Sequence, residues 1–397
     1  MVTMSTFDAA LKEVYENPTR DQINIGSGAF AMKVEQTPRD IVGGRRVIKP
    51  APYGVNGGTG SGSDTDALPV SGGNKYADFI STIKSVRGVI KFTDQVMKAS
   101  RSDRAAFLSA MQSEEDGMLK SLKHTYGRQM YMDGVGKLAV CGTTSASTTV
   151  TVASTQYLVE GQTIDIRDGS NALITNGTQR RIEAVNRAAK TIVLDTAGGV
   201  VTTTSANYIT EQGSYNKEIT GMEAVYAQSG TLYTLSKTDY PWLIPYQHPN
   251  TGDIEDQKII DVINYVEEFF GSTINLIPVN PAVETEYYKY LEVTKRSPNP
   301  LVLEGGYKAL SIGGRPMTKD RFVKPGVMKL LDTTQWQMHT MDGGDWSWLD
   351  EDGKILKWVS GYAMWTAAMI KYCELICNHP GGQAELTGIT TTSTLFS

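Results

Sequence analysis

The feature that most restricts the fold of this chain is one long segment with helical periodicity, residues 102–134. Ser102 and Asp103 can cap its first turn. A helix of about 30 residues is roughly 45 Å long. Gly117 and Gly127 lie inside it, and each costs roughly 1 kcal/mol relative to alanine, so packing along one apolar stripe must hold the helix together. The stripe consists of Phe107, Met111, Met118, Leu122, Tyr126 and Met130. We therefore expect a rigid spine.

A glycine- and serine-rich segment lies upstream of this helix. Seven of the ten residues 54–63 are Gly or Ser, and such a segment buries too little apolar surface to offset its ordering entropy. Residues 79–97 then alternate loosely between apolar and charged side chains, as in a strand that returns from a long hairpin. Further upstream, residues 5–15 have the spacing of a short amphipathic helix. Residues 26–52 lack sustained periodicity and are expected to form an extended arm.

The composition changes sharply at Gly142, where a threonine-rich, β-branched segment begins. Asp168-Gly169 and Asn176-Gly177 are typical of turns between short strands. We interpret this segment as a small all-β module inserted into a host domain, with a β-rich part of one larger sheet as the alternative. The strands predicted within it are residues 148–153, 163–167, 179–185 and 191–195.

The remaining chain has mixed helix and strand patterns. Gly271 is the expected C-cap of the first helix, and Asn280-Pro281 begins the second. An acidic turn at residues 350–353 precedes a strand, and the apolar stretch 359–377 follows it. The helices predicted here are residues 253–270 and 281–296, and the strands are residues 274–279, 322–331, 336–348 and 355–358.

Size and composition narrow the classes of protein. A chain of 397 residues exceeds the size of one hydrophobic core, so two or three packed units are expected. Its 40% hydrophobic and 20% charged residues are typical of a folded soluble protein. A net charge of -5 argues against tight DNA binding, which needs a clustered basic surface. The longest apolar-leaning uncharged run, residues 358–370, is too short to cross a bilayer as a helix, so no membrane anchor is predicted.

Two further features concern the compartment of the protein. Cys141, Cys373 and Cys377 are an odd number of cysteines in a long chain, which is a poor basis for a disulfide framework. A reducing cytoplasm suits them better. The charged residues between Asp8 and Glu16 interrupt the apolar stretch that a secretory signal would need.

Candidate chemical sites were considered against simpler structural interpretations. Cys373, Cys377 and His379 are the nearest approach to a metal cluster, but buried thiols beside a turn explain them better. The acidic residues Asp342, Asp345, Asp350 and Asp352 could ligate a hard cation, although a solvated hairpin tip is favoured. Phosphate-loop and GxSxG motifs are absent from the sequence. We predict no catalytic, cofactor-binding or metal-binding residue.

The tryptophans and histidines are treated in the same way. Trp346, Trp348 and Trp358 could form a sugar-binding or base-stacking platform, but packing in a core or a subunit interface is the favoured interpretation. The histidines are far apart in the sequence and form no HExxH pattern. They are His124, His248, His339 and His379.

The order of these elements resembles that of the Hong Kong 97-like major capsid proteins of tailed bacteriophages. The stretches that carry the resemblance are residues 79–100, 239–243, 275–281, 313–317 and 378–384. The resemblance implies an α+β fold with an N-arm, an extended loop, a peripheral domain with the spine helix, and an axial domain. The implied parts are an N-arm 1–49, an extended loop 50–100, a peripheral domain 101–141, an inserted β domain 142–212, a peripheral return 213–239, an axial domain 240–345 and C-terminal strands 346–397.

The resemblance also implies a function and partners. The subunit would assemble with itself into the pentamers and hexamers of an icosahedral head, inside the host bacterial cytoplasm. The shell would enclose double-stranded DNA without sequence recognition. A scaffolding protein, a portal and a decoration protein are candidate further partners. Two alternatives remain: a cellular encapsulin-like nanocompartment shell, and a β-rich glycan-degrading phage enzyme that uses Asp342 or Asp345.

Overall fold

The structure is a computed structural model that describes most of the chain. Statements below refer to the described residues, which are 29–35, 39–40, 46–95, 104–249, 251–294, 301–302, 308–341, 346–350 and 355–392. The expected helix at residues 5–15 lies outside them.

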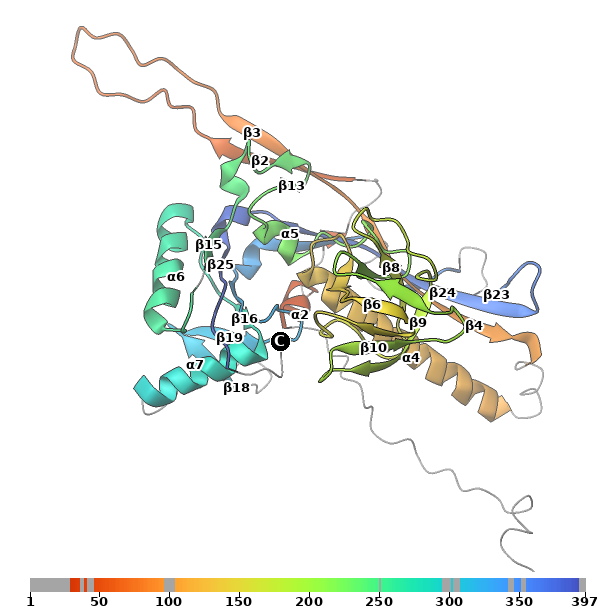
Figure 1. The fold of residues 1–397 in the computed structure, drawn as a ribbon. Helices are drawn as coiled ribbons and strands as arrows, with labels where there is room; N and C mark the ends of the chain where they lie inside the picture. The colour runs from red at the N-terminus through yellow and green to blue at the C-terminus, as the bar shows by residue number, and fades with distance from the viewer. Residues whose placement is uncertain are drawn as a thin grey trace, which may run out of the picture.

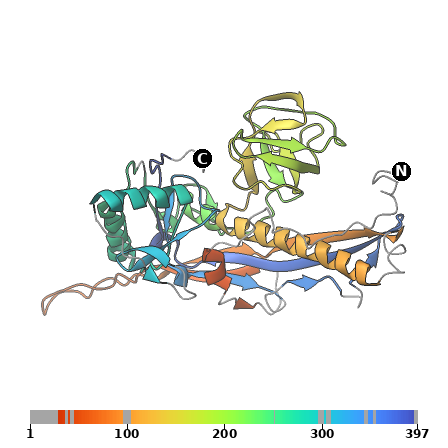
Figure 2. The ribbon, with the colours of Figure 1, turned by 90° about the horizontal axis from the view of Figure 1, so that it is seen from below.

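The spine helix is present as α4, Arg104–Tyr131. Figure 2 shows it lying along the length of two strands, β4 (Lys84–Thr93) and β24 (Met364–Cys377). The stripe residues Met118, Leu122, Tyr126 and Met130 are buried, which confirms the predicted helix and its apolar face. The side chains of Phe107 and Met111 are not among those described.

The spine helix packs on a sheet built around β24. Ten residue pairs align β24 with β4, from Met364 opposite Thr93 to Cys373 opposite Lys84. On its other edge, β24 pairs successively with β23 (Lys357–Trp358), β22 (Ser347–Trp348) and β21 (Trp336–Thr340). The short strand β1 (Arg39–Asp40) continues the sheet beside β21. The apolar stretch 359–377 therefore contains the central strand of the body, residues 364–377.

The expected extended arm at residues 26–52 is wrong in part, because Ala29–Glu35 forms the helix α2. Phe30 is fully buried, with its ring 5.7 Å from that of Tyr131 and 5.3 Å from that of Trp336. A helix of this length has too few turns to show a period, and it is stabilised by tertiary packing. The sequence pattern therefore missed it.

A long hairpin follows, as predicted. Its strands β2 (Arg46–Gly54) and β3 (Lys75–Thr82) pair antiparallel, and residues 55–74 connect them. The returning segment differs from the single strand expected at residues 79–97. It changes partner at Ile83: β3 pairs with β2, whereas β4 pairs with β24.

The threonine-rich segment forms a β unit, which Figure 2 shows on the side of α4 that faces away from β24. Its main sheet has the order β5-β12-β8-β9-β10-β7, and β11 pairs with β6. The side chains of Ile164, Ile166, Ile182 and Ile192 are fully buried in it. Its strands are β5 (Lys137–Val140), β6 (Thr144–Ser147), β7 (Thr149–Thr151), β8 (Thr163–Arg167), β9 (Arg180–Asn186), β10 (Thr191–Leu194), β11 (Val201–Thr203) and β12 (Tyr208–Glu211).

The strands predicted at residues 148–153, 163–167, 179–185 and 191–195 match β7, β8, β9 and β10, with boundaries shifted by a few residues. The sheet begins earlier than the composition change at Gly142, because β5 pairs with the closing strand β12. β5, β6, β11 and β12 were not predicted.

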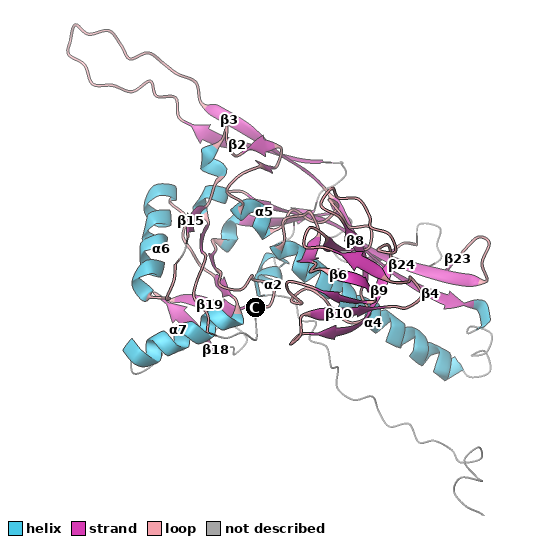
Figure 3. Ribbon diagram, in the orientation of Figure 1, coloured by secondary structure: helices cyan, strands magenta, loops and turns pink. Residues whose placement is uncertain are grey.

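A second hydrophobic core lies at the other end of the molecule, where α6 (Asp256–Phe270) and α7 (Pro281–Thr294) cover a mixed sheet (Figure 3). The sheet has the order β15-β25-β20-β16-β19-β18-β17. Gly271 ends α6 with a φ of 64°, as its capping role requires. The strands are β15 (Tyr246–His248), β16 (Ile277–Val279), β17 (Leu301–Val302), β18 (Lys308–Ile312), β19 (Arg315–Lys319), β20 (Met328–Leu330) and β25 (Ala384–Leu386).

Both predicted helices of this region are confirmed, but the predicted strands are longer than those found. The strands expected at residues 274–279 and 355–358 are shortened to β16 and β23, and the strand expected at residues 336–348 corresponds to two strands, β21 and β22. Only Met328–Leu330 of the strand expected at residues 322–331 is a strand. Turns occupy the residues before it, and Gly326 has a φ of 68°. The apolar residues Phe322 and Val323 are buried in a loop instead, in the hydrophobic core that α4, β4 and β24 share.

Short elements connect these units. They are α5 (Met222–Tyr226), β13 (Thr231–Leu232), β14 (Leu235–Ser236) and the 3₁₀ turns η3 (Pro241–Leu243), η4 (Thr333–Gln335) and η6 (Pro380–Gly382). Within the described residues, no helix has the length and apolar character needed to cross a bilayer.

Candidate assembly elements and the buried polar junction

The connection between β2 and β3 extends away from the rest of the molecule (Figure 1). Its residues 55–74 have no helix or strand structure, and nearly all are exposed. Three large apolar side chains lie on it: Val55, Leu68 and Val70 are 88%, 91% and 91% exposed. Exposed apolar residues on a projecting segment are typical of a contact with another chain.

Aromatic side chains hold the root of this hairpin. The ring of Trp242 stacks against Tyr53 from β2 at 5.6 Å and against Phe79 from β3 at 5.9 Å. Tyr233 contacts the same Phe79 ring at 5.3 Å, and its carbonyl accepts a hydrogen bond from the Ile80 amide. Both strands of the hairpin are therefore fixed to the segment that follows α5.

Polar contacts fix the same root to the central sheet. Lys49 Nζ on β2 donates to Gln337 Oε1 at 2.6 Å and to Asn378 Oδ1 at 2.9 Å. Ser81 Oγ on β3 donates to Glu374 Oε1 at 2.9 Å. Each strand of the hairpin thus has one side chain bound to the β21–β24 region, and the direction of the hairpin depends on these contacts.

A buried ion pair lies at the end of the spine helix. The Arg128 guanidinium is fully buried and lies 2.6 Å from Glu218 Oε1 and 3.0 Å from Glu211 Oε2. Burial alone lowers the pKa of Arg128, but the two carboxylates raise it overall. Arg128 therefore stays charged, whereas burial raises the pKa of Glu218 although Arg128 acts to lower it. The contacts join α4 to the segment that leaves the β unit.

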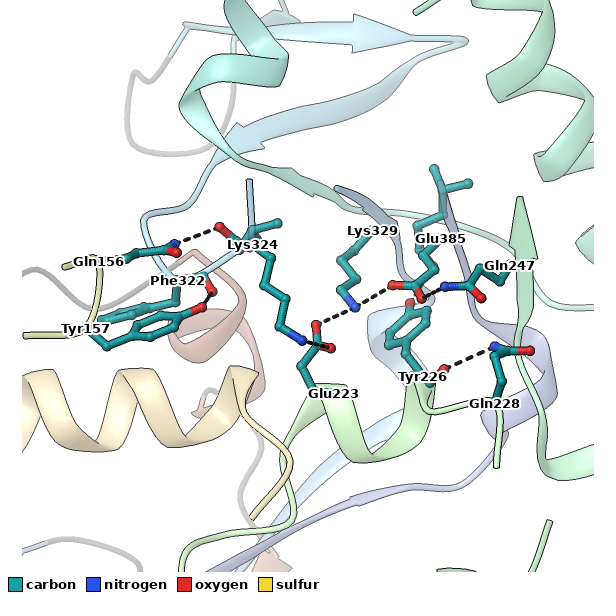
Figure 4. Close-up of polar contacts among 12 residues, drawn as sticks. Gln156, Tyr157, Glu223, Tyr226, Gln228, Gln247, Phe322, Lys324, Lys329 and Glu385 are labelled. Carbon is teal, nitrogen blue, oxygen red and sulfur yellow. Dashed lines mark hydrogen bonds and ion pairs between the residues drawn. The ribbon is translucent and has the colours of Figure 1, made fainter. Parts of the chain in front are cut away.

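A second set of charges, centred on the buried Lys329, joins the central body to the second core, as Figure 4 shows. Lys329 Nζ on β20 lies 2.8 Å from Glu223 Oε1 on α5 and 2.6 Å from Glu385 Oε2 on β25. Lys324 Nζ reaches the other Glu223 oxygen at 2.7 Å. Burial alone raises the pKa of Glu223, but Lys329 and Lys324 lower it overall. We call Glu223, Lys324, Lys329 and Glu385 the polar junction.

Neighbouring groups complete the polar junction. The Tyr226 ring lies 4.0 Å from Lys329 Nζ, a cation–π contact. Gln247 Nε2 donates to Glu385 Oε1 at 2.9 Å. The lysine is 1% exposed, so its charge is balanced almost entirely by the protein. Removing Lys329 would leave Glu223 and Glu385 without their buried partner.

The β unit touches the same region through two residues, also visible in Figure 4. Gln156 Nε2 donates to the carbonyls of Arg321 and Val323 at 2.6 and 2.8 Å, and Tyr157 Oη donates to the Phe322 carbonyl at 2.9 Å. These bonds attach the β unit to the loop before β20. A polar cavity of about 900 Å³ separates other parts of the unit from β4 and α4.

The residues considered as chemical sites are placed as follows. Cys373 and Cys377 are buried on β24, and burial raises the pKa of the Cys377 thiol well above its usual range. Burial lowers the pKa of His379, whose ring lies 6.1 Å from that of Phe270. Within the described residues, no three His, Cys, Asp or Glu side chains are grouped as metal ligands. Asp342, Asp345 and Asp352 lie outside those residues.

The tryptophans are used mainly in packing. Trp346 lies 6.1 Å from the Tyr126 ring, and Trp348 packs against the same core. Trp358 is half exposed and contacts Trp365 edge-on at 5.3 Å. The packing interpretation therefore agrees with the structure for Trp346 and Trp348, and only in part for Trp358.

Sequence reasoning did not single out the charged residues that join the units. One signal was available, because Lys371 and Glu374 interrupt the otherwise apolar strand at residues 364–377. A charge in a strand of this kind is either paired or functionally important. For Lys329 and Glu385 the neighbouring sequence has no comparable pattern.

Comparisons with known proteins address the fold. No family model and no curated protein matches the sequence. The structure is similar to a chain of the cyanophage A-1(L) capsid asymmetric unit, with a TM-score of 0.62 and 11% identity over 98% of this chain and 100% of that one. It is also similar to a chain of the SrpI encapsulin complex of Synechococcus elongatus, with a TM-score of 0.51 and 9% identity over 99% and 97%.

These similarities extend over nearly the whole of each chain. The protein therefore shares its α+β fold with a phage capsid chain and an encapsulin chain, which confirms the capsid-type fold expected from the sequence. At this identity the likeness concerns the fold, and function must be argued from the features described above.

Proposed function

We propose that this chain is the major capsid protein of a tailed bacteriophage and has a structural role, not an enzymatic one. The observation that carries the proposal is the projecting hairpin of a capsid-type fold, whose Val55, Leu68 and Val70 are exposed on residues 55–74. In a single subunit these side chains remain in water. Repeated contacts with other copies would bury them in a closed shell, and each modest contact would be multiplied by the number of neighbours.

We propose the following division of the chain. The N-arm is 1–49, the extended loop 50–100, the peripheral domain 101–141 and 213–239, the axial domain 240–345 and the closing strands 346–397. Residues 142–212 form an inserted all-β domain. The β5–β12 sheet supports the insertion, and so does the small set of contacts made by Gln156 and Tyr157.

The partners follow from this role. The subunit associates with itself as pentamers and hexamers of an icosahedral head, because one closed shell must place the same sequence in both rings. The head encloses double-stranded DNA without base recognition, consistent with a net charge of -5. A scaffolding protein, a portal and a decoration protein are further candidate partners. Assembly in the bacterial cytoplasm suits three buried free cysteines.

Electron microscopy of the purified full chain tests the proposal directly. We expect closed hollow particles from the wild type, alone or with a scaffolding protein. Only monomers or small oligomers under both conditions would contradict a shell function.

Two variants test the role of the hairpin. Deletion of residues 54–63 should leave a folded subunit that does not complete shells. The double variant Leu68→Ser/Val70→Ser should also weaken assembly. The matched control, Thr59→Ala/Ser61→Ala, changes exposed polar residues of the same loop and should assemble normally. Normal shells from the first two variants would remove the hairpin from the assembly mechanism.

A nanocompartment shell is the second candidate, and the likeness to the encapsulin chain favours it. The higher TM-score of the cyanophage chain, 0.62 against 0.51, places the phage capsid first. Particles isolated from the native source separate the two functions. Nuclease-protected DNA supports the capsid, and enclosed protein without DNA supports the compartment.

A further inference from the structure

One buried carboxyl group links three segments of the chain at the root of the hairpin. Glu374 lies near the C-terminal end of β24 and is 0% exposed. Its Oε1 accepts a hydrogen bond from Ser81 Oγ on β3 at 2.9 Å and from the Thr220 amide at 3.3 Å. Thr220 directly precedes the turn into α5. The carboxyl group thus holds the hairpin and the chain returning from the β unit against the central strand.

The environment of this group is unusual for a charged carboxylate. Within the described residues, Glu374 Oε2 has no hydrogen-bond partner. Burial raises the pKa of Glu374 to about 7, although Thr220, Ser81 and Lys84 act to lower it. An ionised carboxylate in such a place is costly unless it is paired and hydrogen-bonded. The group is therefore balanced between its neutral and charged forms near neutral pH.

Several other ionisable groups lie near Glu374. The positive charge of Lys84, at the start of β4, acts to lower the pKa of Glu374. His339 lies opposite Glu374 on β21. The Tyr233 phenol, beside the hairpin root, has its pKa raised by burial and also by Cys377 and Glu374. Cys373 adjoins Glu374 on β24 and is buried.

We propose that the protonation state of Glu374 controls how firmly the hairpin root is attached to the body. The neutral carboxyl is buried at little cost between β24, β3 and the segment before α5. Ionisation strengthens its two hydrogen bonds but leaves a buried charge, and the cost of that charge favours an open form in which water reaches the carboxylate. The hairpin is then easier to redirect at higher pH. This property belongs to the single subunit and holds whether or not the protein forms shells.

Hydrogen exchange of the full chain, measured by mass spectrometry between pH 5 and 8.5, tests the proposal. At each pH, the exchange rate of the β3 amides in the wild type is divided by their rate in Glu374→Gln. The intrinsic exchange rate also changes with pH, but it is the same in both proteins and cancels in this ratio. We expect the wild type to open more readily, relative to the variant, by up to roughly two orders of magnitude as pH rises from 5 to 7.5. The ratio should then become constant.

The sign follows from linkage. A folded-state pKa above the ordinary value gives stability that is present at low pH and is lost as pH rises through the folded pKa. Amides of β8 in the β unit serve as the internal control, and their ratio should not depend on pH. A pH-independent ratio in β3 would refute the proposal.

A second variant guards against poor folding of Glu374→Gln. Ser81→Ala removes a donor that stabilises the charged form, so the opening transition of β3 should continue to higher pH than in the wild type. Ser85→Ala, a nearby serine that bonds Arg87, is the matched control and should follow the wild type. An unchanged transition in Ser81→Ala would also count against the assignment.

Discussion

The polar junction offers the sharpest test of how the two cores are held together. Lys329 and Lys324 both bind Glu223, at 2.8 and 2.7 Å, but the side chain of Lys329 is 1% exposed and that of Lys324 is 50% exposed. Lys329→Met leaves Glu223 and Glu385 without a buried partner, and loss of such a partner costs about 4 kcal/mol. Lys324→Met removes an exposed pair, worth less than about 1 kcal/mol. Because the substitution is the same at both positions, the difference between the two losses in stability reports the effect of burial.

The free energy of unfolding should be measured by denaturant titration of the unassembled subunit, with tryptophan fluorescence and circular dichroism as separate probes. The two probes are needed because a chain with two cores can unfold in more than one step. We expect the Lys329→Met deficit to exceed that of Lys324→Met at least threefold at pH 7.

The pH dependence gives a second check. In the wild type the pKa of Glu223 is lowered overall, so its stabilising effect is present above the ordinary pKa of a carboxyl group and is lost as pH falls. Lys329→Met removes part of this effect, and its stability should approach that of the wild type as pH falls towards 4. Equal deficits for the two lysine variants, or a Lys329→Met deficit that does not shrink at low pH, would refute the reasoning.

Two other predictions concern packing. A Cβ at Gly88 would lie 2.8 Å from a leucine of the spine helix, so Gly88→Ala should destabilise the subunit by about 1–3 kcal/mol. Gly117 has open space around it inside α4, so Gly117→Ala should instead stabilise by up to about 1 kcal/mol, measured in the same titrations. Cys141, Cys373 and Cys377 are buried, so they should react with iodoacetamide only on unfolding. Fast labelling of the native subunit, read by mass spectrometry, would contradict this burial.

The elements that the sequence predicted best are those whose pattern repeats over several turns or strands. The spine helix has a stripe from Met118 to Met130, and the helix ending at Gly271 has both an apolar stripe and a glycine cap. The strands of the β unit follow turn signals such as Asn176-Gly177. In each case local sequence and tertiary packing favour the same structure.

The failures have a common physical cause, which is that tertiary contacts decided the local structure. The helix at residues 29–35 exists because Phe30 packs against Tyr131 and Trp336. Phe322 and Val323 look like part of a strand, yet they are buried in a loop before β20.

The residues that join the units were also beyond sequence reasoning. Lys329, Glu223 and Glu385 come from three distant parts of the chain, and their spacing carries no local signal. Buried ion pairs of this kind are recognised only once the fold places them together. Glu374 is the exception, because its position inside an apolar strand was visible in the sequence.

The pairing of β4 with β24 has a consequence for synthesis of the protein. Residues 84–93 cannot acquire their partners until residues 364–373 have left the ribosome. Contacts so distant in sequence form slowly, because a long loop must close before they are made. Until residues 364–377 have been made, the sheet on which the spine helix packs lacks its central strand. The β unit has all its strands within residues 137–211, so it can fold earlier. Chains that end before residue 364 would lack the central strand and could not form the body of the subunit.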